Sequence, residues 1–505
     1  MISISATTSI LLGVTLVALI LILVDYMRSK TPKKLYDGEE ASALLDPPGP
    51  KPWPILGSLH IFGRYDLPYK AFGDLVKLYD SQIIKLRLGS LPCVVINGLE
   101  NIKEVLVAKG HHFDSRPNFI RYHLLFSGNK ENSLAFCNWS DIQKTRREML
   151  RPHTFPRAFT ARYNQLNVII GGEMELLIDQ LVSVSGVSLH AKPLIMHTCA
   201  NVFLKYFCSQ RFGLGHGPFR TMIENFDKVF YEVNQGYAAD FMPFLMPLHQ
   251  RNMTKMANWS HEIRKFVEEN IIGDRLTSWK SVIPEEDLID CLINHIQTGA
   301  EPKITWDTAL FALEDIIGGH SAVGNLLIKI LGYLVTRPHV QKTAQKEIDG
   351  VETSSRFVGL ENRGNMPYTE AIILEAIRLI ASPIVPHVAN QDSSIAGYKI
   401  EKDTFIFLNN YDLNMSNKLW TSPEEFMPQR FVQNGRLLKP EHFLPFGGGR
   451  RSCMGYKMVQ YISFSTIATL LKNFNIVPVE KEIYKIPIGN LALPEKTFNF
   501  RFERR

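Results

Sequence analysis

The sequence predicts a mainly α-helical protein with small β-sheets and a single membrane-spanning helix at its N-terminus. Long apolar patterns with helical periodicity occupy residues 305–336 and 366–379, and prolines follow each of them. Short strand-like runs at 83–88 and 93–96 flank a glycine turn. Residues 1–24 contain no charged side chain, and about 20 helical residues are enough to cross the hydrocarbon core of a bilayer.

The N-terminal apolar run is expected to be an anchor that is not removed. It lacks the basic start and the small-residue cleavage site of a secretory signal peptide, which is the competing interpretation. The basic residues follow the run instead, at Arg28, Lys30, Lys33 and Lys34. Because positive charge tends to stay on the cytosolic side, the body of the protein is expected in the cytosol. We therefore predict a transmembrane anchor at 1–27.

A proline-rich segment separates this anchor from the body of the chain. Five prolines fall within residues 46–57, so this stretch cannot be helical and should be stiff and extended. An ordinary linker would have the same composition. We predict a basic and proline-rich hinge at 28–57 and a catalytic domain at 58–505.

Charge and cysteine usage exclude several classes of function. The formal net charge is +6, and no long basic tract is interleaved with aromatic residues, so no nucleic-acid partner is expected. The six cysteines show no C-x-x-C spacing, which argues against a disulfide framework and against a zinc site. Five of them are expected to be buried thiols: Cys93, Cys137, Cys199, Cys208 and Cys291.

The most informative motif is residues 446–455, Phe-Gly-Gly-Gly-Arg-Arg-Ser-Cys-Met-Gly. Glycines allow a tight turn and a close approach to a flat cofactor, and a guanidinium can pair with a propionate. A cysteine thiolate on haem iron favours cleavage of the O–O bond. A flexible loop with a buried thiol is the plainer interpretation, but it does not require this combination of residues at these offsets. The motif therefore predicts that Cys453 is the axial ligand of a haem iron.

The pattern Phe-x-x-Gly-x-Arg-x-Cys-x-Gly resembles the haem-binding loop of cytochrome P450 enzymes. The resemblance implies the P450 fold, haem b, molecular oxygen and electrons from NADPH through NADPH-cytochrome P450 reductase. It assigns cofactor contacts to Phe446, Gly449, Arg451, Cys453 and Gly455.

Two further segments resemble the same family. Glu375-Ala-Ile-Arg378 is similar to its Glu-x-x-Arg helix, and Pro428-Gln-Arg430-Phe431 is similar to its Pro-x-Arg-Phe loop. The resemblance implies that Glu375, Arg378 and Arg430 form a structural ion network that supports the haem-binding core.

Two positions are expected to face the haem propionates. His387 lies where related enzymes often carry a basic residue, although an ordinary turn histidine is an equal alternative. The family usually has an arginine four residues after the tryptophan that corresponds to Trp139, and this chain has Gln143 there. Glutamine can donate a hydrogen bond to a carboxylate but cannot neutralise it. The basic residues that follow suggest either a reductase-docking face or a solvated helix face.

The segment 318–323, Gly-Gly-His-Ser-Ala-Val, departs from the family pattern. It resembles the Ala/Gly-Gly-x-acid-Thr segment that relays protons to bound oxygen, but serine replaces the acid and alanine replaces the threonine. The relay would then run through water, through the histidine or through a substrate hydroxyl; alternatively, the chemistry is not ordinary monooxygenation. The candidate catalytic positions are Gly318, Gly319, His320, Ser321 and Ala322.

The runs 318–325, 382–388 and 446–455 look closest to insect Spook-type P450 enzymes of ecdysteroid biosynthesis. This resemblance implies a monooxygenase-type oxidoreductase of the endoplasmic reticulum membrane that acts on a sterol, in an early step from 7-dehydrocholesterol. One alternative is a P450-fold isomerase or dehydratase without external electrons, and another is a non-catalytic haem carrier or sensor. Apolar segments that could line a sterol site, or equally belong to the core, are 111–126, 237–248, 311–319, 384–388 and 488–493.

Overall fold

The structure is a computed structural model that describes residues 13–20, 22–24, 44–278, 285–299, 304–352, 355–381 and 385–505. The described chain divides into two compact units. The smaller unit comprises residues within Met1–Pro117, Tyr237–Leu248 and Val385–Asp412, and the larger comprises Asn118–Gly236, His249–Ile384 and Leu413–Arg505.

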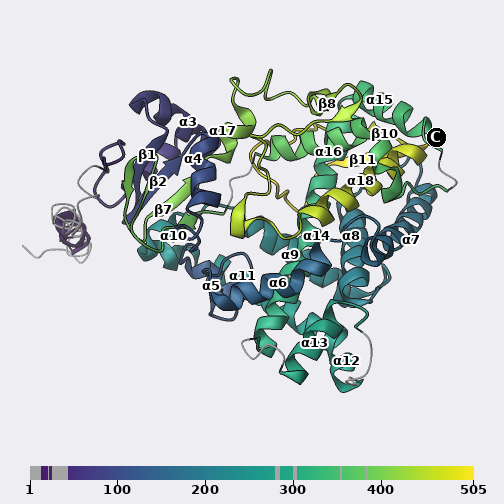
Figure 1. Cartoon of the computed structure of the whole chain (residues 1–505), viewed down its shortest axis with the longest axis horizontal. Helices are drawn as coiled ribbons and strands as arrows, with labels where there is room; N and C mark the ends of the chain where they lie inside the picture. Colours follow the sequence, from purple (N-terminus) through teal and green to yellow (C-terminus); the bar gives the residue numbers. More distant parts are fainter. Residues whose placement is uncertain are drawn as a thin grey trace, which may run out of the picture. The chain divides into compact units, whose positions relative to one another are not determined.

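The smaller unit is built on a four-stranded sheet in the order β1-β2-β7-β4 (Figure 1). The hairpin of β1 and β2 is antiparallel, β2 pairs in parallel with β7, and β4 closes the other edge. The strands of this unit are β1 (Ile83–Leu88), β2 (Leu91–Ile96), β4 (His387–Val388), β5 (Ser393–Ile395), β6 (Tyr398–Ile400) and β7 (Phe405–Leu408). Its helices are α2 (Leu59–Phe62), α3 (Pro68–Tyr79), α4 (Leu99–Lys103) and α10 (Ala238–Phe241).

The described part of the proline-rich segment, residues 44–57, contains no helix, as predicted. It also packs on the sheet: Lys85 N–H donates to the Pro48 carbonyl at 2.8 Å, and Gly89 N–H donates to the Leu56 carbonyl at 3.2 Å. The segment thus forms an edge of the smaller unit, with backbone groups paired to β1 and to the turn that follows it.

The larger unit is mainly helical, which confirms the predicted fold class. Its central helix, α14 (Trp306–Val335), packs against α8, α9, α15, α16 and α18 (Figure 1). The other helices are α5 (Ile120–Leu125), α6 (Asp141–Thr154), α7 (Ala161–Ser183), α8 (Lys192–Cys208), α9 (Gly217–Val233), α11 (Met246–Val267), α12 (Gly273–Ser278), α13 (Leu288–Thr298), α15 (Pro338–Asp349), α16 (Pro367–Ile380), α17 (Asn410–Met415) and α18 (Tyr456–Asn473). Small strand pairs complete it: β3 (Leu189–His190), β10 (Phe474–Pro478) and β11 (Asn499–Arg504) form one sheet, and β8 (Val432–Gln433) pairs with β9 (Arg436–Leu437).

The ends of α14 and α16 follow from local signals in the sequence. The Thr305 hydroxyl accepts a hydrogen bond from Thr308 N–H at 3.3 Å and caps the start of α14. Pro338 follows the helix and begins α15. Pro367 opens α16 at a position where no N–H is needed, and Ala381 ends it in the left-handed conformation. The two predicted helices, 305–336 and 366–379, agree with these bounds within one residue at each end.

The predicted membrane anchor falls mostly outside the described residues. Residues 13–20 and 22–24 are helical and carry exposed aliphatic side chains. Across the described chain, we find no helix whose length and apolar character would allow it to span a membrane.

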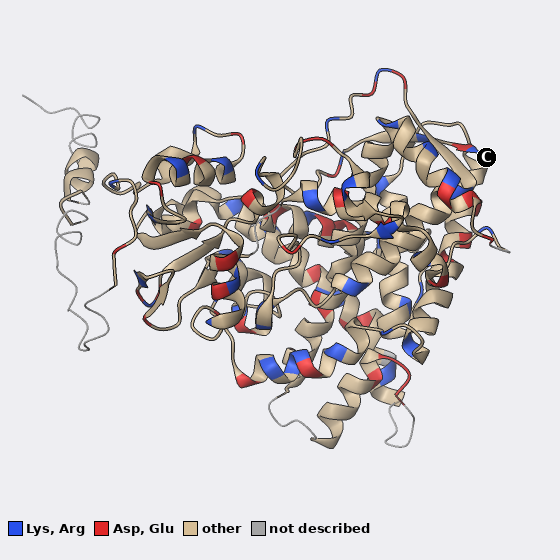
Figure 2. Cartoon of the chain, turned by 45° about the horizontal axis from the view of Figure 1, so that its top comes forward, with Lys and Arg blue, Asp and Glu red and all other residues tan. Residues whose placement is uncertain are grey.

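Basic and acidic residues alternate along many of the described helices in this view (Figure 2). This distribution agrees with the modest net charge of +6. Among the basic residues of α6, Arg146 is buried and Arg147 is half-buried.

Close packing between α14 and α8 depends on a glycine. A Cβ atom at Gly324 would lie 2.3 Å from Met196 Sδ, and Met196 is itself buried. We predict that Gly324→Ala lowers the free energy of unfolding by about 1–2 kcal/mol, because overpacking of ~1–3 kcal/mol exceeds the gain of up to ~1 kcal/mol in helix propensity. Gly172→Ala in α7 is the matched control, because nothing lies within 4 Å of its added Cβ; it should stabilise. Urea denaturation midpoints measure both, and equal shifts would show that α8 and α14 are not closely packed there.

Candidate functional site

Cys453 lies on a short loop between a turn of 3-10 helix, Gly449–Arg451, and the start of α18. Cys453 N–H donates to the Phe446 carbonyl at 2.9 Å and closes the loop. Gly447 and Gly449 have φ of 68° and 61°, a conformation that favours glycine. Among the described cysteines Cys453 is exposed and the other five are buried, so the expectation of five buried thiols is confirmed.

Two sets of influences act on the Cys453 thiol in opposite directions. Burial is the larger influence and raises the pKa of Cys453 above its ordinary value. The backbone N–H groups of Gly455 and Tyr456 and the charge of Arg147 lower the same pKa. Cysteine binds iron as the thiolate, and these three groups are the ones that favour this form.

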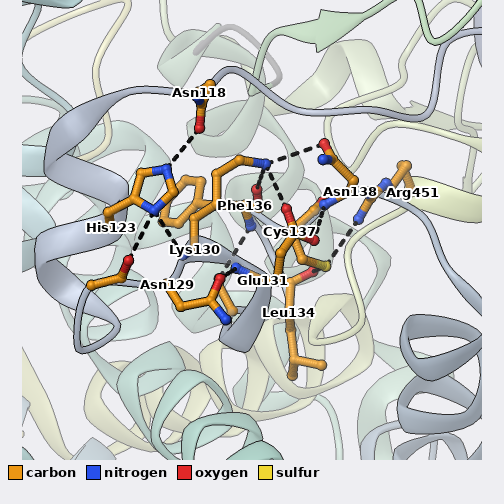
Figure 3. Close-up of polar contacts among 12 residues, drawn as sticks. Asn118, His123, Asn129, Lys130, Glu131, Leu134, Phe136, Cys137, Asn138 and Arg451 are labelled. Atoms are coloured by element: carbon orange, nitrogen blue, oxygen red, sulfur yellow. Dashed lines mark hydrogen bonds and ion pairs between the residues drawn. The ribbon is translucent and has the colours of Figure 1, made fainter.

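Arg451 attaches this loop to the segment that precedes α6. Its guanidinium donates to the backbone carbonyl of Cys137 and lies 3.8 Å from the Cys137 sulfur (Figure 3). The Arg451 and Arg450 guanidinium carbons lie 5.6 Å and 5.0 Å from the ring centre of Trp139. Arg147 of α6 donates to the Ser452 carbonyl at 2.7 Å. The Cys453 loop is therefore held by the hydrogen bonds of Arg451 and Arg147 and by the contacts of Arg450 and Arg451 with Trp139.

Gln143 is buried on α6, and its amide is partly used within the protein. Its Nε2 donates to the Leu134 carbonyl at 2.8 Å. Its Oε1 is buried and has no hydrogen-bond partner among the described residues. The Oε1 atom can only accept a hydrogen bond, so it needs a partner with an N–H or O–H group. An ionised carboxylate has no such group and does not suit it. Arg451 is thus the charged candidate for a propionate.

The basic residues after Gln143 do not form one surface. Arg146 is buried and donates to the carbonyls of Asn132 and Glu131 at 2.7 Å and 2.9 Å. The interpretation of a solvated helix face is wrong for this residue, because its charge serves carbonyl groups inside the fold. Arg147 is half-buried, and Lys144 is exposed.

Asp315 of α14 supports the segment that contains Ser133 and Leu134, and sequence reasoning missed this role. One carboxylate oxygen of Asp315 accepts hydrogen bonds from Leu134 N–H at 2.6 Å and from the Ser133 hydroxyl at 3.0 Å. Burial raises the pKa of Asp315 to about 6. Glu314 pairs with Arg264 at 3.0 Å, and burial raises its pKa to about 7. The signal in the sequence was the pair of adjacent acids, Glu314 and Asp315, within a mostly apolar stretch of α14.

The segment 130–138 is itself tied together by polar contacts. Lys130 Nζ lies 2.9 Å from Glu131 Oε1 and donates to Asn138 Oδ1 at 3.1 Å. Asn138 N–H donates to Glu131 Oε2 at 2.9 Å. Figure 3 shows these contacts beside the pair of Arg451 and Cys137. The segment thus connects Asp315, which it contacts at Leu134, with the Cys453 loop, which it contacts at Cys137.

One strip of α14 is less covered than the rest. From residue 309 to the end of the helix every residue is buried except Asp315, Gly318, Gly319 and Ala322, which are half-buried. Their spacing of three, four and seven residues places them on one face. The four positions thus share one helix face where the sequence predicts oxygen chemistry, and the rings of Phe226 and Phe203 lie close to Gly318 and Gly319.

His320 and Ser321 do not belong to that strip. His320 is fully buried, its Nδ1 lies 2.7 Å from the Ile317 carbonyl, and its ring centre is 5.4 Å from that of Phe226. Burial lowers the pKa of His320 to about 4, so the imidazole is neutral near pH 7. The buried Ser321 hydroxyl lies 3.5 Å from His320 Nε2. A neutral imidazole with its Nδ1 already engaged is a poor proton donor.

The structure brings Glu375, Arg378 and Arg430 together. Arg378 binds both carboxylate oxygens of Glu375 at 2.7 Å and 2.8 Å, and Arg430 Nε donates to the same carboxylate at 3.0 Å. Glu375 and Arg378 are fully buried. Arg378 also donates to the Asn414 carbonyl at 2.7 Å. The network joins α16 to the segment that precedes β8.

His387 lies in the smaller unit, on β4. It is buried, and its Nδ1 lies 2.6 Å from the Phe113 carbonyl. In the smaller unit, Arg116 donates to the Val385 and Pro386 carbonyls at 2.8 Å and 3.2 Å. Of the expected lining segment 384–388, residue 384 lies outside the described residues.

The family model for cytochrome P450 matches residues 47–502. Cytochrome P450 307a1 of Drosophila melanogaster is 40% identical over 89% of this chain and 88% of its own length. Cytochrome P450 1A1 of Macaca fascicularis is 29% identical over 97% of this chain and 96% of its own length. Farnesoate epoxidase of Bombyx mori is 28% identical over 92% of this chain and 94% of its own length.

The predicted resemblance to P450 enzymes, and to insect members in particular, is confirmed by these relatives. Members of the family are monooxygenases that use haem b and receive electrons from NADPH through a reductase. The match covers both structural units and the Cys453 loop. This chain belongs to the cytochrome P450 family.

Proposed function

We propose that this enzyme oxidises a sterol in an early step of ecdysteroid biosynthesis from 7-dehydrocholesterol. The proposal rests on the Spook-type segments of the sequence and on the insect relative at 40% identity. The apolar character of 311–319 and 488–493 suits a flat, apolar substrate.

The observation that carries the haem-thiolate assignment is the exposed Cys453 on a glycine-rich loop that is closed by the hydrogen bond from Cys453 N–H to the Phe446 carbonyl. When bound, haem supplies the activation of oxygen. In this assignment Cys453 holds the iron, and Arg451 faces a propionate. Phe446, Gly449 and Gly455 shape the loop. His387 is a further candidate for a propionate contact. Gln143 remains a candidate only through the second hydrogen of its Nε2, because the first is donated to the Leu134 carbonyl.

On the oxygen side, Ala322 has no hydroxyl and His320 is neutral and enclosed. We therefore assign proton supply to water or to a substrate hydroxyl near Ala322, on the half-buried face that it shares with Asp315, Gly318 and Gly319. The same departure favours the second candidate, an isomerase or dehydratase of the P450 fold, which needs no proton delivery to molecular oxygen.

For location, we propose a single-pass anchor at 1–27, a hinge at 28–57 and a cytosolic catalytic domain at 58–505 on the endoplasmic reticulum membrane. The uncharged residues 1–24 and the basic residues that follow them support this arrangement. NADPH-cytochrome P450 reductase and membrane lipid are then the partners.

The decisive experiment incubates the purified enzyme and reductase with 7-dehydrocholesterol and analyses the products by mass spectrometry. A product that gains oxygen or loses hydrogen, and that requires NADPH and reductase, is expected. Turnover without reductase would favour the isomerase or dehydratase. Full haem loading without any turnover would contradict an enzymatic role for this sterol.

The axial-ligand assignment predicts that Cys453→Ser abolishes the long-wavelength band of the reduced carbon monoxide complex. Serine keeps the side-chain volume but does not provide a thiolate. Cys137→Ser is the matched control and should keep the band, because its backbone carbonyl still receives Arg451. Retention of the band in Cys453→Ser would refute the assignment.

The buried network predicts that Arg378→Ala loses haem and stability together. Removal of one partner leaves the Glu375 carboxylate buried with an incomplete set of donors, which costs about 3–5 kcal/mol. Arg356→Ala is the control, since its ion pairs with Glu175 and Asp179 are exposed and such pairs contribute ~0–1 kcal/mol. Haem content per protein and melting temperature measure the effect, and a haem-replete Arg378→Ala would contradict it.

The strip on α14 predicts that Ala322→Thr keeps the fold but changes how electrons are used. A hydroxyl at this half-buried position can relay protons, so the ratio of sterol product to hydrogen peroxide should change. Val323→Thr adds a hydroxyl at the adjacent, buried position and should leave the ratio near that of the unmodified enzyme. The prediction fails if both variants give the original ratio and product profile.

A further inference from the structure

Three side chains that can bind metal ions converge at α13, a helix that carries none of the site residues discussed above. Glu285 precedes the helix, and Cys291 and His295 lie on it. One ligand atom from each residue lies within 4.8 Å of the other two. In the described part of the chain, no other group of three such residues meets this distance.

The helix places Cys291 and His295 at a suitable separation. Residues four apart lie on the same face of a helix, and Cys291 Sγ is 3.6 Å from His295 Nδ1. In a tetrahedral zinc site with usual Zn–S and Zn–N bond lengths, these two atoms are separated by about 3.6 Å. The distance between Cys291 Sγ and His295 Nδ1 therefore already matches the separation of two ligand atoms in a tetrahedral zinc site.

The third group, Glu285, is held over the same face. Asn294 Nδ2 donates to Glu285 Oε1 at 2.8 Å. The start of α13 is fixed by Asp287, whose carboxylate accepts from Ile289 N–H at 2.9 Å and from Asp290 N–H at 3.1 Å. The Glu285 carboxylate is thus oriented by Asn294, while the Asp287 cap fixes the backbone close to it.

The Cys291 thiol is buried, so a metal ion would meet it inside the fold. Cysteine binds metal ions as the thiolate, and a dication that binds the sulfur displaces the thiol proton.

We propose that Glu285, Cys291 and His295 bind a divalent metal ion of the zinc class, with water in the fourth position of a tetrahedron. A set of one sulfur, one nitrogen and one oxygen ligand suits zinc, whereas calcium and magnesium require oxygen ligands. His295 Nδ1 now lies 2.8 Å from the Cys291 carbonyl, and metal binding exchanges this hydrogen bond for a metal bond.

This site does not depend on the haem assignment. It lies in the larger unit, on α13 and the segment directly before it. A metal ion there would link Glu285 to the first turns of α13. The site was not evident from the sequence because Cys-x-x-x-His supplies only two ligands. The third ligand, Glu285, stands before Asp287, the residue that caps the start of α13.

The test is a zinc titration of the haem-loaded enzyme by isothermal titration calorimetry in metal-free buffer. Haem occupies Cys453 in this form, so that thiol does not compete. We expect one zinc ion per chain. Each of Cys291→Ser, His295→Gln and Glu285→Gln should weaken binding by roughly 100-fold. His261→Gln, at an exposed histidine of α11, is the matched control and should bind zinc as the unmodified enzyme does.

A second measurement separates loss of a ligand from loss of the fold. Cys291 is buried, whereas Glu285 is exposed and His295 is half-buried, so the latter two variants should keep their melting temperature and haem spectrum. Cadmium NMR of the cadmium-loaded enzyme should show a thiolate-shifted signal that disappears in Cys291→Ser.

The proposal is overturned if the unmodified enzyme binds no zinc at micromolar concentrations. It is also overturned if the Glu285 and His295 variants bind zinc unchanged. Neither result would affect the haem-thiolate assignment, which the carbon monoxide spectrum of the same samples reports separately.

Discussion

The burial of α14 on nearly its whole circumference constrains the larger unit more than any other feature. A helix of 30 residues that is apolar on most sides must be covered, and α8, α9, α15, α16 and α18 provide this cover. Where polar groups occur within it, each needs a partner, and Asp315, Asn325 and Glu314 all have hydrogen bonds. The half-buried strip of Asp315, Gly318, Gly319 and Ala322 is the exception to this cover between residue 309 and the end of the helix.

Hydrogen bonds connect this strip to the cysteine loop within one unit. Asp315 holds the backbone at Leu134, the segment 130–138 holds its own shape, and Cys137 receives Arg451. Each step ends on a backbone group, which has less freedom to move than a side chain. The orientation of the Cys453 loop thus depends on the position of α14 through this series of hydrogen bonds.

Much of the architecture was predictable because its signals are local. Thr305 and Pro338 bound α14, Pro367 begins α16, and the glycines of 446–455 require a turn before the cysteine. The contacts that complete the site are not local. Nothing near Arg146 in the sequence indicates that its guanidinium turns inward to the carbonyls of Asn132 and Glu131.

The same limit explains the other findings that sequence reasoning missed. Asp315 pairs with residues far from it in the sequence, and the proline-rich segment pairs with β1 through backbone groups that no side-chain pattern reveals. The role of Gln143 was expected from its position after Trp139, but its orientation is set by the Leu134 carbonyl.

The glycine pair in α14 carries a consequence for sequence variation among relatives. A Cβ at Gly318 would lie 2.9 Å from the ring of Phe226, and one at Gly319 would lie 3.1 Å from the ring of Phe203. A larger residue at either position requires a smaller one on the facing helix, since both rings already occupy the space. Positions 318 and 226, and positions 319 and 203, should therefore covary in an alignment. Evolution from a glycine that faces a phenylalanine to a larger residue that faces a smaller one requires two substitutions. The protein with only one of them is either overpacked or contains a void.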